Sequence, residues 1–415
     1  MNPRSNNGIA DHTVLNSLPV ECRGWRERMI VKRLARLHTG RLSVTLSAGQ
    51  QLTFSGPQDG PEADIRIKSP RLVNRLLTAG SVGFAEGYIA DEWTSNNLQA
   101  LIYLLHLNDS ALQPDWSRLG PIRAAADGWR AFRARNNRRG AQRNVAYHYD
   151  LGNDFYARWL DETWTYSSAL FASPDDDLAT AQQRKYQRLL DRLGTKPGDH
   201  ILEIGCGWGG FACFAAAKAD VHVTGITLSR EQLRFARAAA DSAGLSDRVS
   251  FEIRDYRDVH EQYDHIVSIE MYEAVGEAYW PTYFSAIQQA LVPGGRAALQ
   301  AITIDEKRFA AYRRQLDFIQ KYIFPGGMLA SPSVFAEHAR RQGLAEVERA
   351  FFGADYARTL MCWDQGIRAA SAPIISERGA EFYRMWRYYL AYCAAGFTSG
   401  NINLAQIVLT KPSTP

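Results

Sequence analysis

Apolar and polar positions alternate in the first part of the chain and change to helical spacing further on. The stretch RLSVTLSAGQQLTFSG, within residues 25–57, alternates in places and predicts a β-hairpin closed near Gly49. The stretch DIRIKSPRLVNRLLTAG predicts a short strand that enters a helix at Pro70, and Gly80 is the expected end of that helix. A further helix is expected from Asn97 to Leu107. Together these elements predict a small α+β domain.

A second pattern, in which strands alternate with helices, begins at an amphipathic helix from Asp177 to Leu193. Further helices are expected at residues 210–218, 229–243 and 279–291. Apolar runs between and after them predict the strands HILEIG, HVTGITL, VSFEIRD, DHIVSIE and GRAALQAITI. Such alternation implies right-handed crossovers and a mainly parallel sheet that is covered on both faces. The fold class of this part is therefore α/β.

An arginine-rich segment separates the two patterns. Between Arg123 and Arg143 lie seven arginines, both of these included, and Asp127 is the only acidic residue among them. The segment fits a solvated linker with helical ends, and it also fits a patch that contacts the phosphates of lipid headgroups. We expect an N-terminal α+β domain, an Arg-rich linker and an α/β domain, at residues 1–125, 126–145 and 146–415.

Composition narrows the class of protein and its compartment. A formal net charge of +4 over 415 residues gives no argument for nucleic-acid binding. The 5 cysteines are an odd number without metal-type spacing, which indicates a reducing compartment and neither a disulfide framework nor a metal site. The first residues lack a signal-peptide pattern, and no run reaches about 18 uninterrupted apolar residues. We expect a cytoplasmic protein that is at most peripheral to the inner face of the membrane.

The stretch ILEIGCGWGGF, from Ile201 to Phe211, carries the main chemical signal. In a sheet of this kind the ligand lies beyond the carboxyl ends of the strands, where the first strand passes into its helix. Glycines at that point allow a tight turn and let a ligand lie against bare backbone. A purely structural glycine turn is the alternative. The expected ligand is a nucleotide-like cofactor held at Gly205, Gly207 and Gly209.

Acidic and polar residues at the strand ends distinguish the candidate cofactors. A dinucleotide site calls for a carboxylate near the end of the second strand, but ITLSREQ offers only polar candidates such as Thr227 and Gln232. The third strand ends at Asp255 and Tyr256, which suit an adenine amine and an adenine ring. These features favour S-adenosylmethionine over NAD. The expected cofactor residues are Glu203, Gly205, Gly207, Gly209, Thr227, Leu228, Gln232, Asp255 and Tyr256.

Several motifs in order then resemble one family. YHYDLGNDFYARWLDETWTYSSALF, LEIGCGWGG, GITLSREQ, RDYRDV, VSIEMYEAVG, KYIFPGG and FGADYARTLMCW together resemble the cyclopropane-fatty-acyl-phospholipid synthase family, and the likeness covers nearly the whole chain. The resemblance implies a Rossmann-like class I methyltransferase domain with a mostly parallel sheet. It also implies a reaction, in which a methyl group passes from S-adenosylmethionine to the double bond of a phospholipid acyl chain and a cyclopropane ring forms.

The family also implies a base. Addition of a methyl group to an alkene leaves a carbocation, and in the family a bound bicarbonate removes a proton as the ring closes. Matched by position, Glu273, Tyr322 and the backbone amide of Ile302 would hold that bicarbonate, and Cys393 matches a further cysteine. Taken alone, Glu273 also fits a helix cap, and Tyr322 and Cys393 also fit core positions. The methionine end of the cofactor would meet Tyr166 and Ser167.

Three positions depart from the family pattern: Ser168 replaces a cysteine, Gln300 a histidine and Ala274 a second histidine. Ser168 can still give its main-chain amide to the anion, and Gln300 can donate a hydrogen bond but cannot relay a proton. If deprotonation became slow, the cation would instead lose a different proton. A non-cyclising C-methyltransferase, with a methylene- or methyl-branched product, is therefore the alternative to the ring.

Two other functions compete with these. A methyltransferase for a small polar acceptor would need a hydrophilic pocket, whereas MYEAVGEAYWPTYF and RFAAYRRQLDFIQKYIFPGG supply apolar walls beside Arg and Lys. A non-catalytic lipid-binding module would not need the intact glycines or the carboxylates of Glu203, Asp255 and Glu273. The expected partners are phospholipid acyl chains at the membrane surface and, as in the family, a second copy of the chain.

Overall fold

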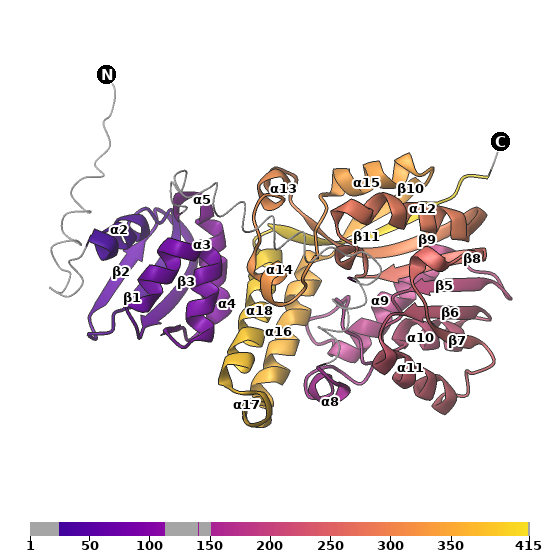
Figure 1. Cartoon of the computed structure of the whole chain (residues 1–415), viewed down its shortest axis with the longest axis horizontal. Helices are drawn as coiled ribbons and strands as arrows, with labels where there is room; N and C mark the ends of the chain where they lie inside the picture. The colour runs from indigo at the N-terminus through magenta and orange to yellow at the C-terminus, as the bar shows by residue number, and fades with distance from the viewer. Residues whose placement is uncertain (1–24, 113–139, 141–150, 414–415) are drawn as a thin grey trace, which may run out of the picture. The chain divides into compact units, whose positions relative to one another are not determined.

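The computed structural model describes residues 25–112, Gly140 and residues 151–413 (Figure 1). The chain divides into unit 1, which comprises Met1–Gly120 and Ser371–Ser399, and unit 2, which comprises Pro121–Ala370 and Gly400–Pro415. The predicted Arg-rich linker lies outside the described residues except for Gly140. Unit 2 begins at Pro121 and the predicted α/β domain at residue 146, and Ser371–Ser399 group with the N-terminal residues rather than with the sheet around them in sequence.

Unit 1 is built on a four-stranded sheet in the order β2-β1-β3-β4. β1 and β2 form the predicted antiparallel hairpin, with Arg41 opposite Ser55 and a turn at Gly49, whose φ is 84°. β3 pairs in parallel with β1 and antiparallel with β4. The strands are β1 (Thr39–Thr45), β2 (Gln51–Ser55), β3 (Gln58–Ile67) and β4 (Trp93–Thr94). The helices are α2 (Trp25–Leu34), α3 (Arg71–Ile89), α4 (Leu98–Leu107), α5 (Asp109–Leu112), α17 (Ser371–Arg378) and α18 (Ala380–Thr398).

Gly80 ends the first helical segment of α3, as the sequence predicts. Its backbone is non-helical, with a φ of 58° and a ψ of −131°, so α3 consists of two helical segments that meet in a kink at Gly80. The apolar pattern continues in the second segment, where Val82, Ala85 and Tyr88 are buried. The sequence analysis did not predict this second segment, which follows directly and runs to Ile89.

Helix α18 completes unit 1 although it comes almost at the end of the chain. The ring of Tyr388 lies 5.9 Å from that of Tyr88 and 6.5 Å from that of Trp93. Arg384 Nε donates to the carbonyl oxygen of Ile89 at 2.6 Å. These contacts, between residues far apart in sequence, explain why the domain division follows packing and not chain order.

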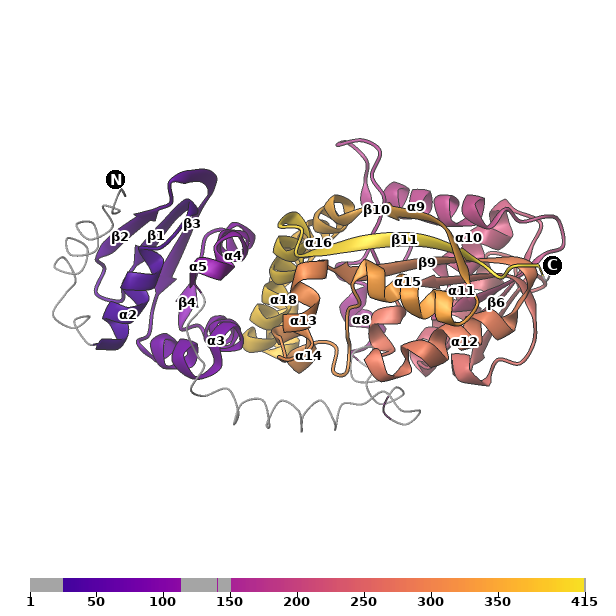
Figure 2. The ribbon, with the colours of Figure 1, turned by 90° about the horizontal axis from the view of Figure 1, so that it is seen from above.

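Unit 2 contains a seven-stranded sheet in the order β10-β11-β9-β8-β5-β6-β7. The strands from β5 to β9 pair in parallel, which confirms the predicted α/β class. β10 and β11 add an antiparallel edge that the sequence pattern did not predict, and Figure 2 shows β11 running along β9. The strands are β5 (His200–Ile204), β6 (His222–Thr227), β7 (Val249–Ile253), β8 (Tyr263–Ile269), β9 (Leu291–Ile304), β10 (Ala345–Phe351) and β11 (Ile402–Thr410).

Helices cover both faces of this sheet (Figure 1). Alternate residues of the strands face opposite cores, so that Ile201 packs with Leu189 and Phe211, whereas Leu202 packs with Trp280 and Phe335. One face carries α9 (Leu178–Leu193), α10 (Gly210–Lys218) and α11 (Arg230–Ser242). The other face carries α12 (Trp280–Ala290) and α15 (Pro332–Arg341).

Unit 2 contains several short helices and turns and one longer helix besides those that cover the sheet. They are α8 (Asn153–Tyr156), the 3-10 turns η2 (Tyr256–Asp258), η3 (Tyr272–Ala274) and η4 (Glu277–Tyr279), and α13 (Glu306–Tyr312), α14 (Phe318–Tyr322) and α16 (Gly353–Ala369). Among the described residues of the chain, no helix is long and apolar enough to cross a membrane.

Candidate active site

The predicted glycine turn connects β5 to α10, and three of its glycines have positive φ values. A Cβ atom on Gly205 would lie 2.9 Å from Met271 Cγ, and one on Gly209 would lie 2.7 Å from Phe251 Cζ. At Gly207, where φ is 54°, an added Cβ would meet no atom within 4 Å. Two glycines thus make room for side chains of the protein itself, and Gly207 presents bare backbone to open space.

Glu203 supplies a buried carboxylate directly before this turn. The residue is 3% exposed, and its Oε2 atom has no hydrogen-bond partner among the described residues. Burial raises the pKa of Glu203 well above its usual range, against the opposing effects of the Ala212 backbone amide and the Lys185 charge. A buried polar atom without a partner is the kind of group that a bound ligand satisfies. The turn and Glu203 together fit the predicted cofactor site.

Polar side chains at the carboxyl end of β6 form one buried cluster. Thr227 Oγ1 donates to Gln232 Oε1 at 2.9 Å, and the Ser229 backbone amide donates to Thr227 Oγ1 at 3.1 Å. Ser229 also caps α11 through its side chain. Leu228 lies between them and is half-buried. The structure therefore brings together the candidates that the sequence placed at the end of the second strand.

Asp255, at the end of the next strand, is already paired within the chain. Its carboxylate accepts hydrogen bonds from Arg257 Nε at 2.8 Å and from an Arg257 terminal nitrogen at 2.6 Å, and both side chains are 10% exposed. Any adenine amine would have to share this carboxylate with the guanidinium group. The Tyr256 ring packs edge-on against Tyr283 at 5.6 Å, and burial raises the pKa of Tyr256 to about 12.

The segment with Tyr166 and Ser167 adds an aromatic wall and a buried lysine. The ring of Tyr166 lies 5.4 Å from that of Trp159 and 5.1 Å from that of Trp363. Lys185, which is fully buried on α9, donates from Nζ to Ser167 Oγ at 2.7 Å. Burial lowers the pKa of Lys185 to about 7, although nearby carboxylates, foremost Glu270, oppose this shift. Sequence reasoning did not select Lys185, because a lysine on an amphipathic helix usually faces solvent.

A carboxylate that the sequence analysis did not select lies at the centre of the site. Glu270 follows the last residue of β8, with a positive φ of 52°. Its Oε1 atom accepts from the Ser168 backbone amide and from Gln300 Nε2, each at 2.8 Å. Its Oε2 atom accepts from the Tyr356 hydroxyl. Ser168 and Gln300, two predicted catalytic residues, therefore meet at one carboxylate.

Glu273 lies three residues further on, in η3, and does not cap a helix. Its Oε1 atom accepts from the backbone amide of Ile302, and its Oε2 atom has no hydrogen-bond partner among the described residues. Desolvation, with a smaller contribution from the charge of Glu270, raises the pKa of Glu273 to about 8. Glu273 and the Ile302 backbone amide, which were both predicted to hold bicarbonate, are thus hydrogen-bonded to each other, beside a second acidic group.

The predicted tyrosine and cysteine belong to other helices. Tyr322 is the last residue of α14, with its ring 5.5 Å from that of Phe318. Cys393 lies on α18, which belongs to unit 1. A hydroxyl that the sequence analysis did not select, that of Tyr356 on α16, donates to Glu270, and it lies within the motif FGADYARTLMCW. That motif contributed to the resemblance, but nothing in its spacing distinguished this tyrosine as a site residue.

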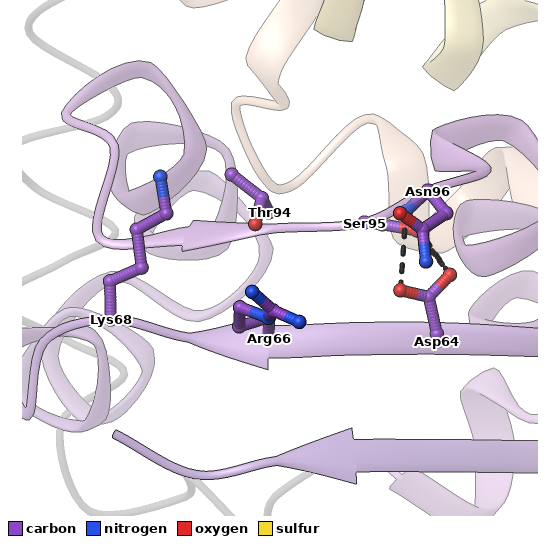
Figure 3. A pocket seen from close by; sticks show the side chains of 6 residues that line it. All are labelled: Asp64, Arg66, Lys68, Thr94, Ser95 and Asn96. Atoms are coloured by element: carbon purple, nitrogen blue, oxygen red, sulfur yellow. Dashed lines mark hydrogen bonds between the residues drawn. The ribbon is translucent and has the colours of Figure 1, made fainter. Parts of the chain in front are cut away.

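A polar pocket of about 290 Å³ lies in unit 1, at the edge of its sheet (Figure 3). Asp64 accepts from the Asn96 backbone amide at 3.1 Å, and Lys68 pairs with Asp91 at 2.8 Å. None of the predicted site residues lines this pocket, whose walls are Asp64, Arg66, Lys68, Thr94, Ser95 and Asn96. It is therefore separate from the residues described above.

Known proteins resemble this chain in sequence and in fold. A family profile described as mycolic acid cyclopropane synthetase matches residues 136–407. The chain is 41% identical over 396 residues to the tuberculostearic acid methyltransferase UfaA1 of Mycobacterium tuberculosis. This alignment covers 93% of the present chain and 92% of the relative. It is 37% identical over 365 residues to the cyclopropane-fatty-acyl-phospholipid synthase of Escherichia coli, with 88% and 91% covered.

A solved structure agrees with the sequence relatives. The mycolic acid cyclopropane synthase CmaA1, complexed with SAH and CTAB, matches with a TM-score of 0.62 at 32% identity, over 65% of this chain and 98% of that chain. The profile covers the α/β unit, and both relatives align over almost their whole length. For these reasons the chain belongs to the cyclopropane-fatty-acyl-phospholipid synthase family of S-adenosylmethionine-dependent methyltransferases.

Proposed function

We propose that this methyltransferase transfers a methyl(ene) carbon from S-adenosylmethionine to the cis double bond of an unsaturated phospholipid acyl chain, with a cyclopropane ring as the product. The observation that carries the proposal is the pair of carboxylates, Glu270 and Glu273, at the carboxyl end of β8 in the same sheet as the glycine turn. Such a reaction passes through positive charge on the lipid, which buried carboxylates stabilise.

S-adenosylmethionine, when bound, supplies an electrophilic methyl group on a sulfonium. Gly207 offers bare backbone for close approach, and Glu203 offers an unsatisfied carboxylate oxygen. The buried cluster of Thr227 and Gln232 stands at the end of the neighbouring strand, where ribose hydroxyls are commonly held. These residues fit the cofactor through backbone and polar contacts.

The aromatic wall suits the cationic part of this chemistry. The rings of Tyr166, Trp159 and Trp363 lie within 5.7 Å of one another, and electron-rich ring faces attract positive charge. Apolar surfaces also exclude water, which would otherwise trap a carbocation. This environment favours an alkene over a small polar acceptor as the methyl acceptor.

A non-cyclising product is the second candidate, and one observation favours it. Gln300 stands where the family pattern has histidine, and its amide donates to Glu270 and accepts from Gln406. An amide does not titrate in this range, so Gln300 cannot relay a proton as histidine can. The relative at 41% identity is named a tuberculostearic acid methyltransferase. Slower proton removal at this position would favour a methylene- or methyl-branched chain over a ring.

The lipid is proposed to meet the protein at the membrane surface, through the arginine-rich segment that lies outside the described residues. Charge reversal at Arg135, Arg138 and Arg139 should weaken sedimentation with vesicles of anionic phospholipid, because each basic residue near such a surface contributes about 1 kcal/mol. Unchanged sedimentation would identify the segment as a solvated linker.

The function is tested by incubating the full chain with vesicles of a monounsaturated phospholipid and methyl-labelled S-adenosylmethionine, followed by mass analysis of the lipid. The expected product is one CH₂ unit heavier than the substrate and keeps its mass on mild hydrogenation, as a ring does. A product that takes up hydrogen is a methylene-branched chain, which only a separate reductant could convert to a methyl-branched one. Absence of label in every unsaturated lipid would overturn the proposal.

A further inference from the structure

Three of the donors that the resemblance assigns to bicarbonate, on Ser168, Gln300 and Ile302, already hold a carboxylate of this chain. The Ser168 backbone amide and Gln300 Nε2 both donate to Glu270 Oε1 at 2.8 Å. The third expected donor, the backbone amide of Ile302, donates to Glu273. A carboxylate has the planar O–C–O shape and the single charge of bicarbonate, so both compete for the same donors. Bicarbonate therefore does not fit this site while Glu270 occupies it.

The backbone directs Glu270 into this position. Its φ of 52° is uncommon for a residue with a side chain, and such conformations persist only where the surroundings fix them. The Glu270 backbone amide donates to the carbonyl oxygen of Gln300 at 2.8 Å, which fixes the chain at the end of β8. Both the backbone and the carboxylate of Glu270 are thus held by the same neighbouring strand.

The donors around Glu270 are themselves oriented. Gln300 Oε1 accepts from Gln406 Nε2 at 2.9 Å, so the amide NH₂ of Gln300 is turned toward Glu270. The Tyr356 hydroxyl binds the other oxygen of Glu270. Desolvation raises the pKa of Glu270, and these hydrogen bonds and the charge of Lys185 oppose that shift. Burial thus makes the carboxylate more basic, while its donors hold it in place.

We propose that Glu270 is the general base of this enzyme and takes the place of bicarbonate, an inference that rests on the proposed function. The π electrons of the alkene form the new C–C bond as the C–S bond breaks, and sulfur keeps the pair of that bond. The Glu270 carboxylate then accepts one proton from the resulting carbocation, and the freed C–H pair closes the ring or forms a new double bond. The proton ends on Glu270, which afterwards returns it to solvent.

The first test compares the full-length wild type in CO₂-depleted buffer and in buffer with added bicarbonate, with monounsaturated phospholipid vesicles and methyl-labelled S-adenosylmethionine. The labelling rate is expected to change by less than about twofold, because the base is part of the chain. A rate that falls tenfold or more, roughly, without bicarbonate would overturn the inference, since a free base then does the work. Absence of label in both buffers would overturn the proposed function, and the inference with it.

The second test removes the carboxylate. Glu270→Gly should lower the rate by about 100-fold or more and regain part of it with bicarbonate or formate, because either anion fits the vacated donors. Glu270→Gln should lose activity without rescue, since its amide fills the same space. Glu277→Gln, in η4 and paired with Arg313 in the wild type, is the matched control and should keep normal activity.

Titration with S-adenosylhomocysteine distinguishes these effects from loss of structure. Both Glu270 variants should bind it within about threefold of the wild type, because Glu270 holds donors for the base and not for the adenosyl group. Full activity of Glu270→Gln would overturn the inference. Should Glu270→Gly fail to fold, the bicarbonate response of the wild type and the activity of Glu270→Gln still decide.

Discussion

Gln406 donates from Nε2 to Gln300 Oε1 at 2.9 Å, across directly opposite positions of β11 and β9. This bond determines which end of the Gln300 amide faces Glu270, because an amide group has a donor at one end and an acceptor at the other. The orientation of an active-site donor is thus set from the antiparallel edge of the sheet. Both side chains are buried, at 1% exposure for Gln300 and 4% for Gln406, so water does not readily replace the bond.

Replacing Gln406 should therefore reduce activity without a direct contact to substrate. In Gln406→Leu the Gln300 amide loses its fixed orientation, and we expect kcat to fall about tenfold, the effect of one weakened hydrogen bond to a charged group. Affinity for S-adenosylhomocysteine, measured by calorimetry, should stay the same. Gln289→Leu, on the exposed side of α12, is the control. Normal kcat in Gln406→Leu would show that Gln300 needs no such support.

Tyr356 should control both the rate and its pH dependence. Its hydroxyl lowers the pKa of Glu270, so Tyr356→Phe should raise that pKa. Because the base must be ionised, the ascending acid limb of the kcat/KM profile should move to higher pH, and kcat should fall about 10- to 100-fold. A pH–rate profile of Tyr322→Phe gives the comparison for the tyrosine that the resemblance selects. If only Tyr322→Phe moved the limb, the base would be held from α14 and not from α16.

Glu273 should be needed for turnover, but its buried carboxylate should make the folded protein less stable at alkaline pH. Its pKa is raised by burial to about 8, above the usual value of 4.5. The folded state therefore binds the extra proton between pH 4.5 and 8, so stability falls as pH rises through this window and the cost is complete above it. Glu273→Gln removes this cost and should raise the free energy of unfolding at pH 9 by up to about 5 kcal/mol. At pH 5 the gain should be much smaller.

Thermal unfolding of the ligand-free wild type and Glu273→Gln, measured from pH 5 to 9, checks this expectation. The same variant should lose turnover while it keeps its affinity for S-adenosylhomocysteine, because the carboxylate and not the fold is removed. Equal melting temperatures at all pH values would mean that Glu273 is solvated in the folded protein. Normal turnover would remove Glu273 from the mechanism.

Replacement of Gly209 by alanine should mainly reduce stability, whereas the same replacement at Gly207 should mainly reduce cofactor binding. In Gly209→Ala the new Cβ overlaps Phe251, and we expect a loss of about 2–4 kcal/mol in the free energy of unfolding. In Gly207→Ala the Cβ meets open space and the backbone has a left-handed conformation, so the loss should be only about 1 kcal/mol. Affinity for S-adenosylhomocysteine should nevertheless fall about tenfold in Gly207→Ala. Unchanged affinity would separate Gly207 from the ligand.

The local pattern of the sequence predicted the elements of the parallel sheet well. β5 begins at His200, the first residue of its predicted strand, and α10 spans Gly210–Lys218 as predicted. Asp177 and Ser229 cap α9 and α11 through their side chains, as residues of these types do. Such features follow from short stretches of chain, because apolar periodicity and capping depend on neighbours in sequence.

The two antiparallel strands, the continuation of α3 and the place of α18 were not predicted. β10 and β11 lack a helix between parallel partners, which was the signal used for the other strands. Gly80 ends the first helical segment of α3, as a glycine stop does, but a second helical segment follows directly after it. Helix α18 pairs with residues of α3 that precede it by most of the chain, and no local pattern encodes that contact.

The sequence by itself determined the α/β class, the glycine turn, the cofactor class and the family, since each depends on residue types at fixed short spacings. Only the tertiary structure decided which polar groups meet. Ser168 and Glu270 are 102 positions apart, and Gln300 and Gln406 are 106 apart, yet each pair shares a hydrogen bond. A donor and an acceptor so distant are brought together by the register of strands and the path of loops. The identity of the base therefore became visible only when β8, β9, β11 and α16 were assembled.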